Sequence, residues 1–464
     1  MPRPRWALTM EAQMWRNLMD IGMRMHVLAR PPAPAPDKTI KIPTTLSSCK
    51  GEIDLHFYFP EGYTGKYAHG TKKKHGRRHR KKKNGEEKEE GNDDDDHEEE
   101  FGSPITRTST KSTISSIASS ISGSSTLSGT STTSNTSNLS TLTEKPSQTS
   151  YPVLLNFHGG GFTIGRATDD ARWARSVLEY TSAIVVSVEY RLAPEYPFPT
   201  AIEDGVDAAL YLIDHASEFL IDVKRIAFSG FSAGGNMSFS VPIRLEEELR
   251  IRRGNAGKDG YVGRDDIMAE RDEARVVAIA AWYPSLDYTK TREERRSTNV
   301  RKDKDLPKFF TNLFDASYLH PPGGIDLASP WLSPGIAPDH MISKLPENIV
   351  LYTCEYDELQ HEGEVFYRRL VDEFGKKVVF KKVMGVQHAF DKTPNPVKWD
   401  PKFEAMYKDA CKELRRVFWG DSDLEDGAVL LEQKVDREES EGAQKVDTRV
   451  EVVELPPTPE GEDD

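Results

Sequence analysis

The chain has 464 residues, of which 37% are hydrophobic and 30% are charged, and its formal net charge at pH 7 is −13. A fully folded chain of this length should be nearer ~45–50% apolar, so either the core is poor or much of the chain does not pack. Three cysteines exclude a disulfide scaffold, and their spacing matches no zinc site or C-x-x-C motif. No run of ~18 apolar residues predicts a transmembrane helix.

The first 30 residues carry large apolar side chains at roughly helical spacing. These are Trp6, Met10, Met14, Trp15, Met19 and Met23. Such a stripe usually packs against its own protein, which here predicts a cap helix that covers a pocket. The alternative is weak contact of residues 1–30 with a membrane surface.

The N-terminus lacks the apolar region and small-residue cleavage site of a secretory signal. Arg3 and Arg5 precede the first acidic residue, Glu11, so a mitochondrial presequence is a minor alternative. We expect a reducing, cytoplasmic location.

Residues 66–150 form a low-complexity insert. A basic run at 72–83 is followed by an acidic run, and 29 of the 48 residues from 103 to 150 are Ser or Thr. Such a composition buries too little apolar surface to offset the entropy of ordering, so we expect disorder. The basic run is either a solvated charged loop or a nuclear-localisation signal.

Residues 420–464 form an acidic tail with a net charge of −12, while the insert carries +2. The remaining segments, 1–65 and 151–419, therefore carry only −3 and suit one large domain. The overall acidity is a property of the tail, which we expect to be disordered, and says nothing about a substrate.

Short apolar strands alternate with helical patterns in these two segments. The predicted strands are 51–59, 153–158, 183–189, 224–229, 276–283, 348–354 and 378–384, and the predicted helices are 168–181, 200–217, 233–249, 362–374 and 401–418. This alternation predicts an α/β fold with a mostly parallel sheet covered on both faces.

The sequence Gly-Phe-Ser-Ala-Gly at 230–234 lies between a predicted strand and a predicted helix. G-x-S-x-G in this context is typical of a nucleophile elbow, which exposes the serine hydroxyl at a helix N-terminus. Ser232 is therefore the candidate nucleophile. The alternative is a glycine-rich turn with an idle serine.

The sequence His-Gly-Gly-Gly-Phe at 158–162 follows another predicted strand. Glycines allow backbone N–H groups to approach a ligand, and such groups stabilise the oxyanion of an acyl transfer. A phosphate-binding loop is the alternative, but the required lysine and G-x-G-x-x-G spacing are missing.

Asp357 and His388 follow the last two predicted strands, so the chain order is Ser232, Asp357, His388. In this order the histidine would accept the serine proton and the aspartate would orient the histidine. Glu355 and Glu358 are rival acids, and His361 is a rival base.

Together these segments resemble the hormone-sensitive lipase-like family of α/β-hydrolases. The matching segments are 158–162, 188–204, 230–235, 328–334, 355–363 and 385–390. The resemblance implies an α/β-hydrolase fold with an eight-stranded sheet whose second strand is antiparallel. It also implies a helical cap built from the N-terminal helix and an insertion near 286–325.

The resemblance further implies a serine esterase that acts on a small-molecule carboxylic ester without metal, cofactor or nucleic acid. Gly160, Gly161 and Ala233 would form the oxyanion hole. We also expect Phe162, Phe231 and Tyr283 to line the substrate pocket. The alternative function is a non-catalytic small-molecule receptor or scaffold on the same fold.

Two positions depart from the family pattern, which usually has an acid at 231 and at 361. The first departure puts polar contacts beside the serine in doubt. By the implied topology, the 66–150 insert should leave from the face opposite Ser232, so we expect it to affect location or partners rather than chemistry.

Overall fold

A computed structural model describes residues 3–30, 32–67, 150–255, 273–393, 400–420 and 452–453. The basic run 72–83 and almost all of the 66–150 insert and of the acidic tail lie outside these residues. Within them, no helix is both long and apolar enough to cross a membrane.

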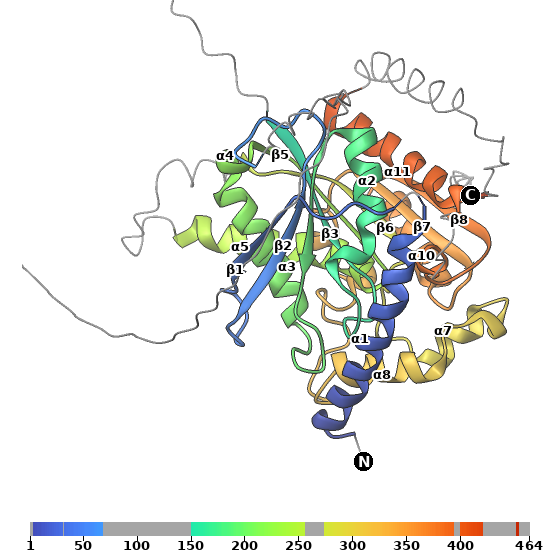
Figure 1. The fold of residues 1–464 in the computed structure, drawn as a ribbon. Helices are drawn as coiled ribbons and strands as arrows, with labels where there is room; N and C mark the ends of the chain where they lie inside the picture. The colour runs from blue at the N-terminus through green and yellow to red at the C-terminus, as the bar shows by residue number, and fades with distance from the viewer. Residues whose placement is uncertain are drawn as a thin grey trace, which may run out of the picture. The chain divides into compact units, whose positions relative to one another are not determined.

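A mostly parallel sheet forms the centre of the fold (Figure 1). Its strands lie in the order β1-β2-β4-β3-β5-β6-β7-β8-β9. They are β1 (Lys38–Pro43), β2 (Glu52–Tyr58), β3 (Tyr151–Phe157), β4 (Ile184–Glu189), β5 (Ile221–Phe231), β6 (Val276–Trp282), β7 (Asn348–Tyr356), β8 (Lys377–Gln387) and β9 (Val452–Val453).

As predicted, β2 runs antiparallel to both of its neighbours, β1 and β4, while β3 to β8 are parallel. Two details differ from the expectation. The edge strand β1 was not among the predicted strands, because only one of its six residues is buried and its apolar pattern is weak. The tail, expected to be disordered, contributes Val452 and Val453, which pair antiparallel with β8.

The longer helices include α1 (Arg5–Leu28), α2 (Ala171–Thr181), α3 (Thr200–Asp214), α5 (Ala233–Asn255), α8 (Lys308–Tyr318), α10 (Gln360–Arg368) and α11 (Pro401–Trp419). The shorter ones are α4 (Ala216–Phe219), α7 (Arg292–Thr298) and α9 (Asp339–Ile342). Each predicted helix is found, and 362–374 ends in a π-helical turn.

The central strands are buried on both faces, because successive side chains of a strand point to opposite sides. Leu155 and Phe157 of β3 pack in one apolar core with side chains of α3, α5 and α10. Leu154 packs in a second core with side chains of α2 and α11. Two helical layers therefore cover the sheet (Figure 1).

The N-terminal helix α1 lies beside α8 (Figure 1). The Trp15 ring stacks on Phe309 at a centroid distance of 5.0 Å, and Arg16 forms an ion pair of 2.8 Å with Glu195. The expectation that the whole apolar stripe is buried is wrong. Only part of it faces the protein, because Trp6, Met10 and Met14 are exposed.

The residues that flank the 68–149 segment lie at the edge of the sheet where β3 and β5 begin. Tyr67 Oη donates a hydrogen bond to Glu218, just before β5, and Arg225 donates one to the Ser150 carbonyl. Ser232 follows the opposite, carboxyl end of β5. Both flanks thus lie away from the serine, as the topology predicted.

We therefore expect that replacing residues 68–149 with a short Gly/Ser linker will keep the hydrolysis rate of a short p-nitrophenyl ester within about threefold, because both flanks are at a remote edge. Steady-state rates of the full chain and the variant check this. A collapse of turnover in a variant with an unchanged circular dichroism spectrum and melting temperature would contradict it.

Candidate active site

Ser232 is the single residue between β5 and α5. Its φ of +55° is left-handed, which is a strained conformation for a residue with a side chain. The neighbouring glycines make this turn feasible, since a Cβ on Gly230 would overlap the Gly234 carbonyl and one on Gly234 would overlap the Phe157 carbonyl. The Ser232 N–H donates to the Trp282 carbonyl at 2.8 Å. The predicted elbow is present.

The structure brings Ser232, His388 and Asp357 together from three separate segments. His388 Nε2 lies 2.8 Å from Ser232 Oγ, and His388 Nδ1 lies 2.7 Å from Asp357 Oδ2. The second oxygen of Asp357 accepts the N–H of Leu359 at 3.0 Å, which holds the carboxylate in place. Such a chain allows the imidazole to take the serine proton while the aspartate stabilises the resulting cation.

The environment of His388 changes its pKa in two opposing directions. Burial lowers the pKa, whereas the charge and hydrogen bond of Asp357, together with the charge of Glu358, raise it. The net result is a pKa above the ordinary 6.5. The imidazole is therefore a stronger base than a free histidine.

The rival residues take other roles in the structure. Glu355 accepts the Gly385 N–H at 2.7 Å, and Glu358 forms ion pairs with arginines of the cap. His361 lines a different cavity, together with Glu358 and Glu362. None of these three makes a hydrogen bond with Ser232 or His388 in the described part of the chain.

The glycine loop 159–161 faces Ser232. Gly160 and Gly161 have φ values of +116° and +58°, and a Cβ would overlap the Ile164 carbonyl at the first position and the Phe314 ring at the second. Among the hydrogen bonds of the described residues, the N–H groups of Gly160, Gly161 and Ala233 donate none. Gly160 and Gly161 line the same cavity as Ser232.

His158 lies beneath this loop rather than in the hydrogen-bond chain. Its ring stacks on Tyr190 at a centroid distance of 4.2 Å, and its Nδ1 lies 2.7 Å from the Gly159 carbonyl oxygen. His158 therefore supports the loop.

A mainly apolar cavity of about 160 Å³ opens above Ser232 and His388. Its apolar walls include Met19, Met23, Ile164, Phe231, Tyr283, Leu306, Phe310 and Phe314. Phe231 and Tyr283 line it as predicted. Phe162 does not, because its fully buried ring stacks on Tyr318 at 3.8 Å, below the glycine loop.

Several lining residues were not predicted from the sequence. Phe310 and Phe314 share one face of α8 through their four-residue spacing, a signal that could have identified them. Lys392, four residues after His388, carries no recognisable motif. Its ammonium group forms ion pairs with Asp170 at 2.8 Å and Asp391 at 3.3 Å.

Lys392 explains how Phe231 fits where the family usually has an acid. The ammonium nitrogen lies 3.7 Å from the centre of the Phe231 ring, whose other contacts include a stack on Trp282 at 5.5 Å. A cation over an aromatic face is an attractive electrostatic contact. The ring therefore provides a neutral but favourable partner for this partly buried cation and an apolar wall for the cavity.

Glu358 connects the cap to the residue beside it, Asp357. Its two oxygens accept hydrogen bonds of 2.7 Å from Arg292 and Arg296 of α7, and only 1% of its side chain is exposed. Arg292 also binds Asp315 of α8 through two bonds of 2.8 and 2.7 Å. Charged hydrogen bonds thus attach α7 to the loop that holds Asp357, and attach α8 to α7.

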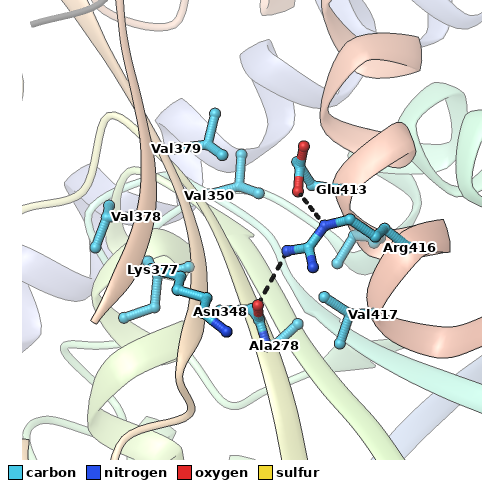
Figure 2. Close-up of a pocket in the computed structure, with 11 residues that line it drawn as sticks. Ala278, Asn348, Val350, Lys377, Val378, Val379, Glu413, Arg416 and Val417 are labelled. Atoms are coloured by element: carbon cyan, nitrogen blue, oxygen red, sulfur yellow. Dashed lines mark hydrogen bonds and ion pairs between the residues drawn. The ribbon is translucent and has the colours of Figure 1, made fainter. Parts of the chain in front are cut away.

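A second cavity lies at the opposite edge of the sheet, between the starts of β6 to β8 and α11 (Figure 2). Its walls are mainly aliphatic, and Arg416 spans it to Glu413 at 3.0 Å and Asn348 at 3.1 Å (Figure 2). None of the candidate site residues lines it. The cavity above Ser232 and His388 is therefore the one that contains the candidate catalytic residues.

Comparisons with known proteins agree with this fold. A model of a family described by the alpha/beta hydrolase fold matches residues 154–392. An arylesterase of Saccharolobus solfataricus is 31% identical over 249 residues, which are 53% of this chain and 71% of the relative. Esterase LipI of Mycobacterium tuberculosis is 29% identical over 247 residues, which are 53% and 67% of the two chains.

Among solved structures, a hyperthermophilic esterase from Pyrobaculum calidifontis superposes with a TM-score of 0.55 and 21% identity, over 89% of this chain and 98% of that one. At this identity the likeness establishes the fold. With the family match and the arylesterase relative, it follows that the chain belongs to the hormone-sensitive lipase-like family of α/β-hydrolases.

Proposed function

We propose that this protein is a serine carboxylesterase that cleaves its ester through an acyl-serine intermediate. The observation that carries the proposal is the continuous hydrogen-bond chain from Ser232 through His388 to Asp357, with distances of 2.8 and 2.7 Å. The relatives named as esterases support the same reaction class.

The mechanism follows from these contacts. His388 Nε2 accepts the proton of Ser232 Oγ as the oxygen attacks the ester carbonyl carbon. The N–H groups of Gly160, Gly161 and Ala233 are the candidate donors to the oxyanion that forms. The protonated imidazole then gives its proton to the departing alcohol. Water, deprotonated by the same imidazole, then attacks the acyl carbon. The bond from this carbon to Ser232 Oγ breaks, the imidazolium returns its proton to Oγ, and the acid is released.

The cavity indicates the class of ester. Its apolar walls of methionine and phenylalanine side chains favour an apolar acyl or aryl group. Its volume of about 160 Å³ favours a short group over a long acyl chain. The name of the arylesterase relative agrees with such a substrate.

If this proposal is right, Ser232→Ala will lower the hydrolysis rate of a short p-nitrophenyl ester at least about a thousandfold, because it removes the nucleophile. A fluorophosphonate probe should label the wild-type chain at Ser232 and leave the variant unlabelled. Ser238→Ala, on a buried serine of α5 outside the cavity, is the matched control and should remain labelled. An active Ser232→Ala protein would contradict Ser232 as the nucleophile. A wild type that is neither labelled nor active would favour a non-catalytic receptor.

The fall of kcat/KM on the low-pH side of its pH profile reports the protonation of the proposed general base, His388. Because His388 must be neutral to accept the serine proton, kcat/KM should fall as the pH drops through its pKa. Burial lowers the pKa of His388, but Asp357 and Glu358 raise it by more than burial lowers it. The midpoint of the fall in kcat/KM should therefore lie above the ordinary 6.5.

Glu358→Gln should move this midpoint to lower pH and reduce kcat, since it removes a charge that raises the His388 pKa and leaves Arg292 and Arg296 without their partner. The measurement is kcat/KM against pH. Glu364→Gln, which removes a carboxylate of α10 paired with Arg368, is the control and should leave the midpoint in place. An unmoved midpoint in Glu358→Gln would show that Glu358 only anchors the cap.

A further inference from the structure

The cap helix α1 carries a continuous exposed apolar face along its full length. The exposed apolar residues are Trp6, Met10, Met14, Leu18, Ile21, Met25 and Leu28. They follow one another at intervals of three or four residues, so they form one stripe on one side of the helix. Trp6 and Leu28, near the two ends, are 68% and 70% exposed.

The opposite face of α1 is held firmly by the protein. Met19 and Met23 line the cavity above Ser232, and Trp15 packs on α8. Arg16 donates hydrogen bonds to the carbonyls of Thr163 at 2.8 Å and Ala193 at 2.7 Å. The helix therefore keeps its orientation, and the exposed stripe is a fixed feature of the cap.

The polar groups beside the stripe are mainly cationic or neutral. The two carboxylates of α1, Glu11 and Asp20, are only 29% and 20% exposed and pair with Arg3 and Arg24. The remaining exposed residues of α1 are Arg5, Gln13, Asn17 and Arg24, and none of them is a carboxylate. The Arg24 side chain is 75% exposed. A helix with one large apolar face, a tryptophan and flanking arginines is typical of segments that lie in a lipid interface.

The neighbouring segment extends this surface. Phe309 of α8, which stacks on Trp15, is itself exposed. The residues just before it include the exposed cations Arg301, Lys302, Lys304 and Lys308, and a single exposed acid, Asp303, which pairs with Arg301 at 2.8 Å. The segment that leads to Phe309 therefore carries an excess of exposed positive charge.

We propose that the exposed face of α1, with the adjoining 300–309 segment, docks on the surface of an anionic lipid bilayer. Apolar side chains would enter the headgroup region, and the cations would face anionic headgroups. A second copy of the chain fits less well, because the two partly exposed carboxylates of α1, Glu11 and Asp20, already pair with Arg3 and Arg24 of the same chain. This inference is independent of the proposed catalytic role of Ser232.

The test is flotation of the full chain with vesicles of phosphatidylcholine, with and without phosphatidylserine. Wild-type protein should float with the anionic vesicles, and the double variant Met14→Glu, Leu18→Glu should bind at least about tenfold less, since it places charges in the stripe. Ile251→Glu, which changes an exposed apolar residue of α5, is the matched control and should bind like wild type. All variants should hydrolyse a short soluble ester at the wild-type rate if they fold.

A local readout separates the stripe from the basic run at 72–83. Vesicles that contain brominated phosphatidylcholine should quench tryptophan emission, and Trp6→Phe should remove much of that quenching because Trp6 lies on the stripe. Equal binding of the double variant and wild type, or quenching unchanged in Trp6→Phe, would overturn the proposal. A doubled mass in light scattering that Met14→Glu, Leu18→Glu abolishes, without vesicle binding, would assign the stripe to a second copy instead.

Discussion

The turn at Ser232 is the constraint on which the rest of the site depends. A left-handed φ at a residue with a side chain costs about 1–3 kcal/mol, and it persists only where the surroundings enforce it. Here β5 lies between β3 and β6, and both neighbours hold the turn. Gly230 and Gly234 pack against Phe157 of β3 on one side, and the Ser232 N–H bonds to Trp282 of β6 on the other. Because the strands are parallel, the loops after β7 and β8 reach the same edge and bring Asp357 and His388 to the serine.

The cap is connected to this edge by charge as well as by apolar packing. Glu358 is almost fully buried between Arg292 and Arg296, and breaking such a buried pair by removing one partner costs ~3–5 kcal/mol. Since the neighbouring residue is Asp357, a shift of the cap would also displace the carboxylate that orients His388. The position of the helices over the cavity is therefore coupled to the hydrogen-bond chain from Asp357 to Ser232.

The cavity also shows how a change of residue type can keep an electrostatic balance. Phe231 replaces the acid usual in the family, and the partly buried Lys392 lies over its ring and pairs with Asp170 and Asp391. The two aspartates supply the compensating charge, and the aromatic ring supplies a weaker attraction. The result is a wall that is apolar toward the substrate and ionic behind it.

The sequence alone was sufficient to predict the mostly parallel strands of the sheet, the elbow, the glycine loop, and Asp357 and His388 as the leading candidates to meet Ser232. These features follow from local rules: strands alternate with helices, a sharp turn needs glycine, and the carboxyl ends of parallel strands converge. The acidic charge could likewise be assigned to the tail from composition.

Only the tertiary structure showed that Asp357, and not Glu355 or Glu358, bonds to His388. It also placed Phe162 beneath the glycine loop and the Lys392 ammonium group over the Phe231 ring. It also decided which apolar side of α1 is covered. Periodicity identifies residues that share a face, but both faces of α1 are apolar, and packing against α8 and the glycine loop selects the one that is buried. Such choices depend on contacts between segments far apart in the chain, which no local pattern contains.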